Sequence, residues 1–304
     1  MILRKRPHGV FLFFALSGSV LPRILPALGV TFLLAVVVTW LHGSVFTLKI
    51  TLTPIPFTLI GLALAIFLGF RNSSSYDRYW EGRKLWGQLL TDIRSLSRQM
   101  MTYVDQDSTW QQRNLRRLIA FAYALKHHLR DSDPVQEWAA FLVSEDQKSA
   151  AASHNRPEAV LRQVSAELAE ILRQRRSDPM LVTNMENLVS SLTYIQGGCE
   201  RIKLTPLPFS FTLLLHRTSY LYCFSLPFGL VDTIGFMTPF VVAIIAYTFF
   251  GLDALGDEIE EPFGLAPNDL PLSTLCRTIE RDVLATLGET NLPEPLRPVG
   301  FQLS

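Results

Sequence analysis

The sequence contains little that a disulfide-stabilised or nucleic-acid-binding protein requires. Its 304 residues include three cysteines, Cys199, Cys223 and Cys276, which are odd in number and far apart. This spacing predicts neither a disulfide framework nor a CxxC metal site. Lysine and arginine together number 28 against 27 aspartates and glutamates, which gives a formal net charge of +1. Because nucleic-acid-binding domains usually carry a basic excess, we expect no nucleic-acid partner.

The chain also lacks the short motifs of common enzyme classes. No ExxH, HxxxH or GxSxG motif and no Walker loop occurs in it. His127 and His128 are adjacent, so on a helix they point about 100° apart and cannot share a metal ion. The sequence therefore predicts no catalytic residue, no metal site and no cofactor.

Long apolar segments are present instead. Hydrophobic residues make up 48% of the chain and charged residues 18%, a balance typical of a protein with membrane and cytosolic parts. Since a membrane span needs about 20 apolar residues, the sequence predicts four spans, at about residues 24–41, 54–70, 206–230 and 236–252. Near the start of the chain, Arg4-Lys5-Arg6 precedes the short apolar run 10–16. We interpret this as an amphipathic segment on the membrane surface.

The placement of lysine and arginine predicts the orientation of these spans. Basic residues precede the first span, follow the second and precede the third, whereas residues 231–235 contain none. Because basic residues accumulate on the cytoplasmic side, both termini and the long middle segment are predicted to be cytoplasmic.

The segment from Arg71 to Lys203 is predicted to be helical. No proline occurs between Pro56 and Pro134, so the second span is expected to continue to about Tyr103, as a helix roughly 70 Å long at about 1.5 Å per residue. Further helices are predicted at residues 110–130, 135–143, 156–175 and 179–196, with a break at 197–198. Strand-like alternation is lacking. The predicted fold is an all-α membrane protein, a single unit over 1–304 with cytosolic helical regions at about 71–203 and 253–304.

Two parallel stripes mark the second span. Small residues recur at a four-residue spacing that favours close helix packing, at Gly61, Ala65 and Gly69. Apolar residues recur one position further on, at Leu62, Ile66 and Phe70. Repeated around an axis by several chains, the second stripe could line a narrow hydrophobic pore. The alternative is a face that packs against lipid or against another span of the same chain.

The pair His216-Arg217 interrupts the apolar run of the third span. Charged groups at membrane depth are costly and usually face the protein interior or water. One interpretation is a water-filled vestibule or ion path. The other is that the span begins later and Arg217 extends to the membrane interface.

Carboxylates follow the fourth span. Asp253, Asp257 and Glu260 share one helical face, whereas Glu258 and Glu261 point elsewhere. The three could bind a cation or set the charge at a pore mouth. Pairing with arginines of the cytosolic helices is the favoured interpretation.

The sequence resembles the bestrophin family, specifically its short bacterial members, over roughly Leu16 to Leu287. The resemblance rests on Ile66-Phe-Leu-Gly-Phe-Arg-Asn-Ser-Ser-Ser-Tyr-Asp-Arg78, Leu85-Trp-Gly87, Gly197-Gly-Cys-Glu-Arg201, Thr205-Pro-Leu-Pro-Phe209, Glu261-Pro-Phe-Gly264 and Asn268-Asp-Leu-Pro271. It implies a homopentamer with four spans per chain, in which the second span lines a central pore. The family's three apolar neck positions fall on Leu62, Ile66 and Phe70, and a second, cytosolic aperture falls on Met180.

The resemblance also implies the function. It predicts a channel in a bacterial inner membrane that passes small monovalent ions passively: chloride by analogy with animal members, with a cation such as sodium as the alternative for bacterial members. The alternative is a membrane-embedded regulatory or scaffolding protein that conducts no ions. Animal members carry a calcium-binding acidic run after the Pro-Phe-Gly motif, but Leu265-Ala-Pro267 stands there in this chain. We therefore expect no calcium activation.

Overall fold

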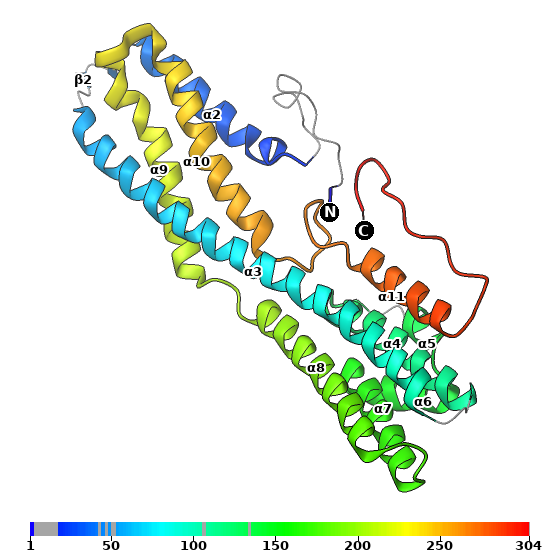
Figure 1. Cartoon of the computed structure of the whole chain (residues 1–304). Coiled ribbons are helices and arrows are strands. Elements are labelled where there is room, and N and C mark those ends of the chain that lie inside the picture. The colour runs from blue at the N-terminus through cyan, green and yellow to red at the C-terminus, as the bar shows by residue number, and fades with distance from the viewer. Residues whose placement is uncertain are drawn as a thin grey trace. The chain divides into compact units, whose positions relative to one another are not determined.

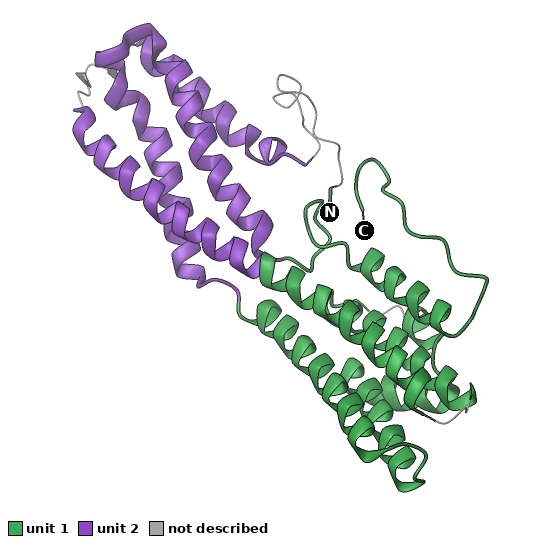
Figure 2. Cartoon of the chain, viewed as in Figure 1, with its two compact units in different colours: residues 1–4, 80–205, 262–304 green, residues 5–79, 206–261 purple. Residues whose placement is uncertain are grey.

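The computed structural model describes residues 1–2, 18–41, 44–45, 48–49, 53–104, 108–132 and 135–303. The predicted amphipathic segment at the start of the chain lies outside these residues. The chain divides into two compact units, coloured green and purple in Figure 2. Unit 1 comprises residues 1–4, 80–205 and 262–304, and unit 2 comprises residues 5–79 and 206–261.

Unit 2 is built from the apolar helices (Figure 1). Its elements are α2 (Leu21–Trp40), the first half of α3 (Pro54–Tyr103), α9 (Phe209–Ile234), the short 3₁₀ helix η1 (Gly235–Met237) and α10 (Thr238–Glu260). Strands β1 (Ser44–Val45) and β2 (Leu48–Lys49) form a small antiparallel pair that the sequence did not predict. Three stretches of the described residues are long and apolar enough to cross a membrane: Leu21–Trp40, Pro54–Tyr103 and Phe209–Glu260.

The third of these stretches contains two helices. Helix α9 ends at Ile234, and the next residue, Gly235, has a positive φ of +53°, which glycine adopts without a steric penalty. Pro239 then lies in the first turn of α10, where a missing N–H costs nothing. As Figure 1 shows, α9 and α10 run antiparallel to each other.

The core of unit 2 is apolar and tightly packed. Leu68 of α3, Cys223 of α9 and Val242 of α10 are fully buried together. Glycines allow the close approach: a Cβ on Gly229 would lie 2.4 Å from the ring of Phe57. Here the small residue serves helix packing, as in other membrane bundles.

Unit 1 is a helical bundle around α4. It contains the second half of α3, α4 (Ser108–Leu129), α5 (Val135–Ala139), α6 (Ser144–Ala152), α7 (Arg156–Arg173), α8 (Pro179–Leu204) and α11 (Leu272–Thr286). Of the 22 residues of α4, sixteen are buried, so it is the central helix. The side chain of Asn155 accepts a hydrogen bond from the backbone N–H of Glu158, which caps α7, and Asp178 caps α8 in the same way.

Several predicted boundaries are confirmed and others are wrong. Helix α3 is uninterrupted over 50 residues, as the absence of proline predicts. The predicted break at 197–198 is wrong, because α8 continues to Leu204. A Cβ on Gly198 would lie 2.9 Å from a methyl of Leu85, so this glycine serves close packing. The helix predicted at 135–143 ends at Ala139, and neither α6 nor α11 was predicted.

The C-terminal region 253–304 is helical only in part. Residues 289–303, after α11, form no helix. Their end lies beside the start of the chain, where the amino group of Met1 donates to the carbonyl of Leu303 at 2.7 Å.

Candidate pore-lining helix

The predicted neck residues lie on an exposed face of α3. The exposed fractions of Leu62, Ile66 and Phe70 are 60%, 48% and 63%, whereas Leu64 and Leu68 are almost wholly buried. Two residues along a helix correspond to a rotation of about 200°. The stripe therefore points away from the chain's own core, and it is not a face that packs against another span of the same chain.

The small residues of α3 divide between two environments. A Cβ on Gly61 would lie 2.7 Å from the hydroxyl of Tyr222, so Gly61 packs against α9 within the chain. Ala65 is exposed, and a Cβ on Gly69 would meet no atom within 4 Å. Two of the three small residues, Ala65 and Gly69, are therefore not covered by other described residues of the chain.

The predicted cytosolic aperture residue lies in unit 1. Met180 is in the first turn of α8 and is 74% exposed. Its backbone N–H donates to the side chain of Asp178 at 2.8 Å, which fixes the turn that carries it.

A buried ionic cluster follows the neck stripe directly. Arg71 has no exposed surface, and its Nη1 donates to Oδ1 of Asp253 at 2.7 Å. Its Nη2 bonds Asp257 and lies 3.9 Å from Glu260. Since a buried charge is tolerated only when it is paired, these carboxylates of α10 hold α3 at the residue after Phe70.

Two further side chains complete this cluster. Nδ1 of His216 lies 2.6 Å from Oδ2 of Asp253, so one carboxylate joins α3, α9 and α10. Arg23 of α2 donates to Asp257 at 2.7 Å. The neighbouring Arg217 is exposed on the surface of the single chain.

The predicted pairing of the carboxylates with arginine is confirmed. Arg71 is the first residue of the segment predicted to be cytosolic, and Arg23, the second partner, precedes the first span. The sequence contained two signals for this pairing. An arginine directly follows the apolar run of the second span, and three carboxylates share one helical face after the apolar run of the fourth span. Within the described residues, no group of three or more His, Cys, Asp or Glu side chains is placed to hold a metal ion.

The loop after α10 is held by an arginine. Nε of Arg130 donates to the carbonyl of Phe263 at 3.2 Å, and its Nη2 to the carbonyl of Leu270 at 3.4 Å. Oδ2 of Asp269 accepts from the backbone N–H of Ala266 at 2.7 Å. Two loop carbonyls and the carboxylate of Asp269 thus accept hydrogen bonds within the protein.

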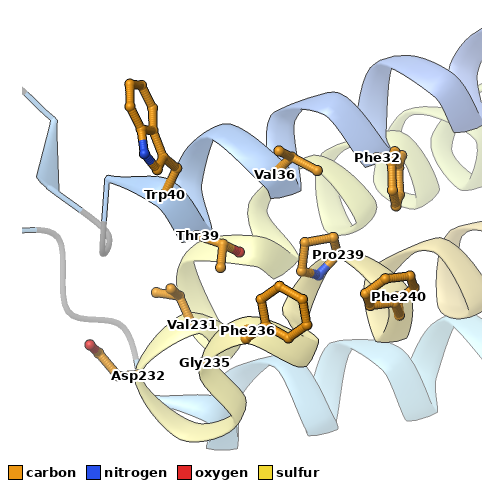
Figure 3. Close-up of a pocket in the computed structure, with 10 residues that line it drawn as sticks. All are labelled: Phe32, Val36, Thr39, Trp40, Val231, Asp232, Gly235, Phe236, Pro239 and Phe240. Carbon is orange, nitrogen blue, oxygen red and sulfur yellow. The ribbon is translucent and has the colours of Figure 1, made fainter.

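An apolar pocket lies at the far end of unit 2. It has a volume of about 580 Å³ and lies between α2, the end of α9, η1 and α10 (Figure 3). The rings of Phe32 and Phe240 meet edge to face, 6.4 Å apart between centroids. Asp232 is the one charged side chain among its lining residues in the described part of the chain. A single carboxylate among mostly apolar lining residues does not make a catalytic constellation, so this pocket suggests no chemistry.

These features define a class of protein: a helical membrane protein with an exposed apolar stripe on a long helix and an ionic cluster that fixes this helix. The particular family follows from comparison. The family model described as bacterial/fungal bestrophin protein matches residues 1–285, and the chain belongs to this family.

Relatives and solved structures agree with this assignment. A Mesorhizobium japonicum protein named as a voltage-dependent anion channel-forming protein is 43% identical over 95% of this chain and 93% of its own length. The Escherichia coli K12 protein YneE, which has the same description, is 40% identical over 98% of both chains. The crystal structure of a bacterial bestrophin homologue from Klebsiella pneumoniae has a TM-score of 0.85 and 39% identity, covering 88% of this chain and 99% of that one.

Proposed function

We propose that five copies of this chain form a channel that passes small monovalent ions passively across a bacterial inner membrane. The observation that carries this proposal is the orientation of Leu62, Ile66 and Phe70, which are exposed opposite the buried side of α3. In a ring of chains, this face would surround the axis. The family membership and the relatives named as anion channel-forming proteins support the same function.

Four spans per chain fit the helices. Helices α2, α9 and α10 contain 20, 26 and 23 residues, and each is long enough for a hydrocarbon core of about 30 Å. The first part of α3 supplies the fourth span. The distribution of lysine and arginine supports a cytoplasmic location for both termini.

A ring assembly fits the two flanks of the neck stripe. On one flank, Ala65 and Gly69 are exposed small residues. On the other, Ile60 and Phe67 are 43% and 49% exposed. Bulky side chains of one copy could pack on the small residues of the next, which is the head-to-tail contact that closes a ring.

The assembly can be tested by mass. In detergent, the protein should have five times the protomer mass of 34.3 kDa. Ala65→Leu should block close packing between neighbouring copies and reduce this mass, whereas Leu33→Ala, at an exposed apolar position on α2, should leave it unchanged. A stable monomer or dimer of the unaltered protein would contradict the proposal.

The neck itself can be tested by conduction. Three apolar rings along about 12 Å, from eight residues at about 1.5 Å each, offer an ion no polar ligand and act as a barrier by dewetting. Changing Leu62, Ile66 and Phe70 together to alanine should widen the neck, raise single-channel conductance in planar bilayers and weaken gating. If the assembled triple variant has unaltered conductance and open probability, these residues do not line the pore. Met180→Ala would test the second aperture in the same way.

Ion flux from purified protein in liposomes separates this function from the alternative. An assembled protein without flux would favour a regulatory or scaffolding role.

A further inference from the structure

The exposed face of α3 continues beyond the neck as a polar face. Ser73, Asp77 and Lys84 follow Phe70 at spacings of three, four and seven residues, and all three are exposed. Seven residues rotate a helix by about 700°, which is within 20° of two full turns. Asp77 therefore lies almost directly below Phe70, about 10 Å along the helix.

The carboxylate of Asp77 has no counter-charge paired with it in the described part of the chain. Among the residues that the structure describes, it has no hydrogen bond and no salt bridge. The two nearest arginines in the sequence are engaged elsewhere. Arg71 is buried among the carboxylates of α10, and Nε of Arg78 donates to the carbonyl of Glu260 at 3.1 Å.

We infer that Asp77 forms a ring of carboxylates at the inner mouth of the neck that attracts monovalent cations and disfavours anions. This inference rests on the proposed function, since five copies around an axis bring the five carboxylates together. Rings of acidic side chains are a usual device of cation-selective pores. The apolar neck supplies no charge of its own, so the nearest charge outside it sets the preference between ions of opposite sign.

Lys84 carries the opposite charge further along the same face. Its distance and the screening by salt make its effect on ions at the neck weaker than that of Asp77. Lys84 lies about 20 Å from Phe70, twice as far as Asp77. Its ammonium lies 5.9 Å from the centre of the Trp80 ring, on the same exposed face. Because the Debye length at 0.1 M salt is about 10 Å, the ammonium is screened at the neck much more strongly than the carboxylate.

The expected effect follows from the same quantities. Five charges about 10 Å from the neck, screened at 0.1 M salt, raise the local concentration of a monovalent cation about threefold and lower that of an anion about threefold. Asp77→Asn should therefore reduce the cation-to-anion permeability ratio roughly tenfold at 0.1 M salt. At 0.01 M salt the Debye length is about 30 Å, and the reduction should be larger.

The experiment is a reversal-potential measurement on the full-length assembled channel in planar bilayers under a sodium chloride gradient. It compares the unaltered protein, Asp77→Asn, Asp77→Lys and a control, Glu145→Gln, which removes an exposed carboxylate of α6. Asp77→Lys should lower the permeability ratio further than Asp77→Asn, and Glu145→Gln should not change it. The growth of the effect at low salt is a readout that a purely structural role would not produce.

A thiol at the same position gives an independent measurement. The three native cysteines are buried, and burial raises the pKa of Cys199 and Cys276 to about 12, so they react slowly. After Asp77→Cys, attachment of a positively charged methanethiosulfonate should lower the cation-to-anion ratio, and a negatively charged reagent should raise it.

The two proposals fail in different ways. If the channel conducts and the triple-alanine neck variant alters conductance, but Asp77→Asn and the labelled Asp77→Cys leave the permeability ratio unchanged, the role of Asp77 is refuted and the channel remains. If the assembled, unaltered protein conducts no ions, both proposals are refuted.

Discussion

Replacement of Arg71 by methionine should destabilise the protein more than any other arginine substitution near the membrane spans. The guanidinium is fully buried, and the side chain of its partner Asp253 is only 6% exposed. Arg71→Met leaves this carboxylate with His216 alone. Removing one partner of a buried ion pair typically costs about 3–5 kcal/mol, because the remaining charge stays buried without its counter-ion.

The chain offers a matched control and a rescue. Arg23 belongs to the same cluster but its side chain is 57% exposed, so Arg23→Met should cost at most about 1 kcal/mol. The double variant Arg71→Met/Asp253→Asn should lose less stability than Arg71→Met, since the neutral amide needs no counter-ion.

The assay is unfolding of the purified oligomer in detergent, followed by intrinsic fluorescence and by the fraction that still elutes as an oligomer. The reasoning is refuted if Arg71→Met is as stable as Arg23→Met. It is also refuted if the double variant loses as much stability as the two single variants, Arg71→Met and Asp253→Asn, lose together. Either result would mean that the cluster does not fix α3.

Two further predictions concern unit 1. Ion flux should not respond to micromolar calcium or to a chelator, because the loop after α10 provides too few free oxygens for a site of six to eight ligands; a steep calcium dependence would show that Phe263 and Leu270 release Arg130. The stability of the protein should also fall as the pH decreases below about 6.5, because burial lowers the pKa of His127 and the unfolded chain binds the proton more readily. His127→Gln should flatten this part of a melting-temperature profile against pH, and the exposed His154→Gln should not; equal slopes for both variants would assign the acid sensitivity to other groups.

Local signals predicted the long elements of the fold. A 50-residue helix was predictable because proline and other stop signals are missing between its ends, and an apolar period of 3.6 residues continues through it. The C-terminal helix α11 was missed, although Cys276, Ile279 and Val283 lie on one buried face. A short amphipathic stretch after a proline-rich loop gives only a weak signal by itself.

The ionic cluster shows where local reasoning ends. The sequence identified the face that carries Asp253 and Asp257, and it identified arginine as the partner. It did not identify Arg71, because the two residues are 182 positions apart and meet only through tertiary packing. The same limit explains Gly198, which was interpreted as a helix stop although its role is set by Leu85 on another helix.

The continuity of α3 also determines how this protein tolerates insertions and deletions. The buried positions Leu64, Leu68 and Arg71 belong to the same uninterrupted helix as the buried positions Trp86 and Leu89, with no loop between them that could absorb a change in length. Adding or deleting one residue between Arg71 and Trp86 would shift the helical phase of Trp86 and Leu89 against that of Leu68 and Arg71 by about 100°. Adding seven residues would restore the angular phase to within about 20° but lengthen the helix by about 10 Å. The spacing between the buried positions Arg71 and Trp86 therefore constrains the length of this segment of α3, whereas most of its exposed positions, Asp77 apart, tolerate substitution.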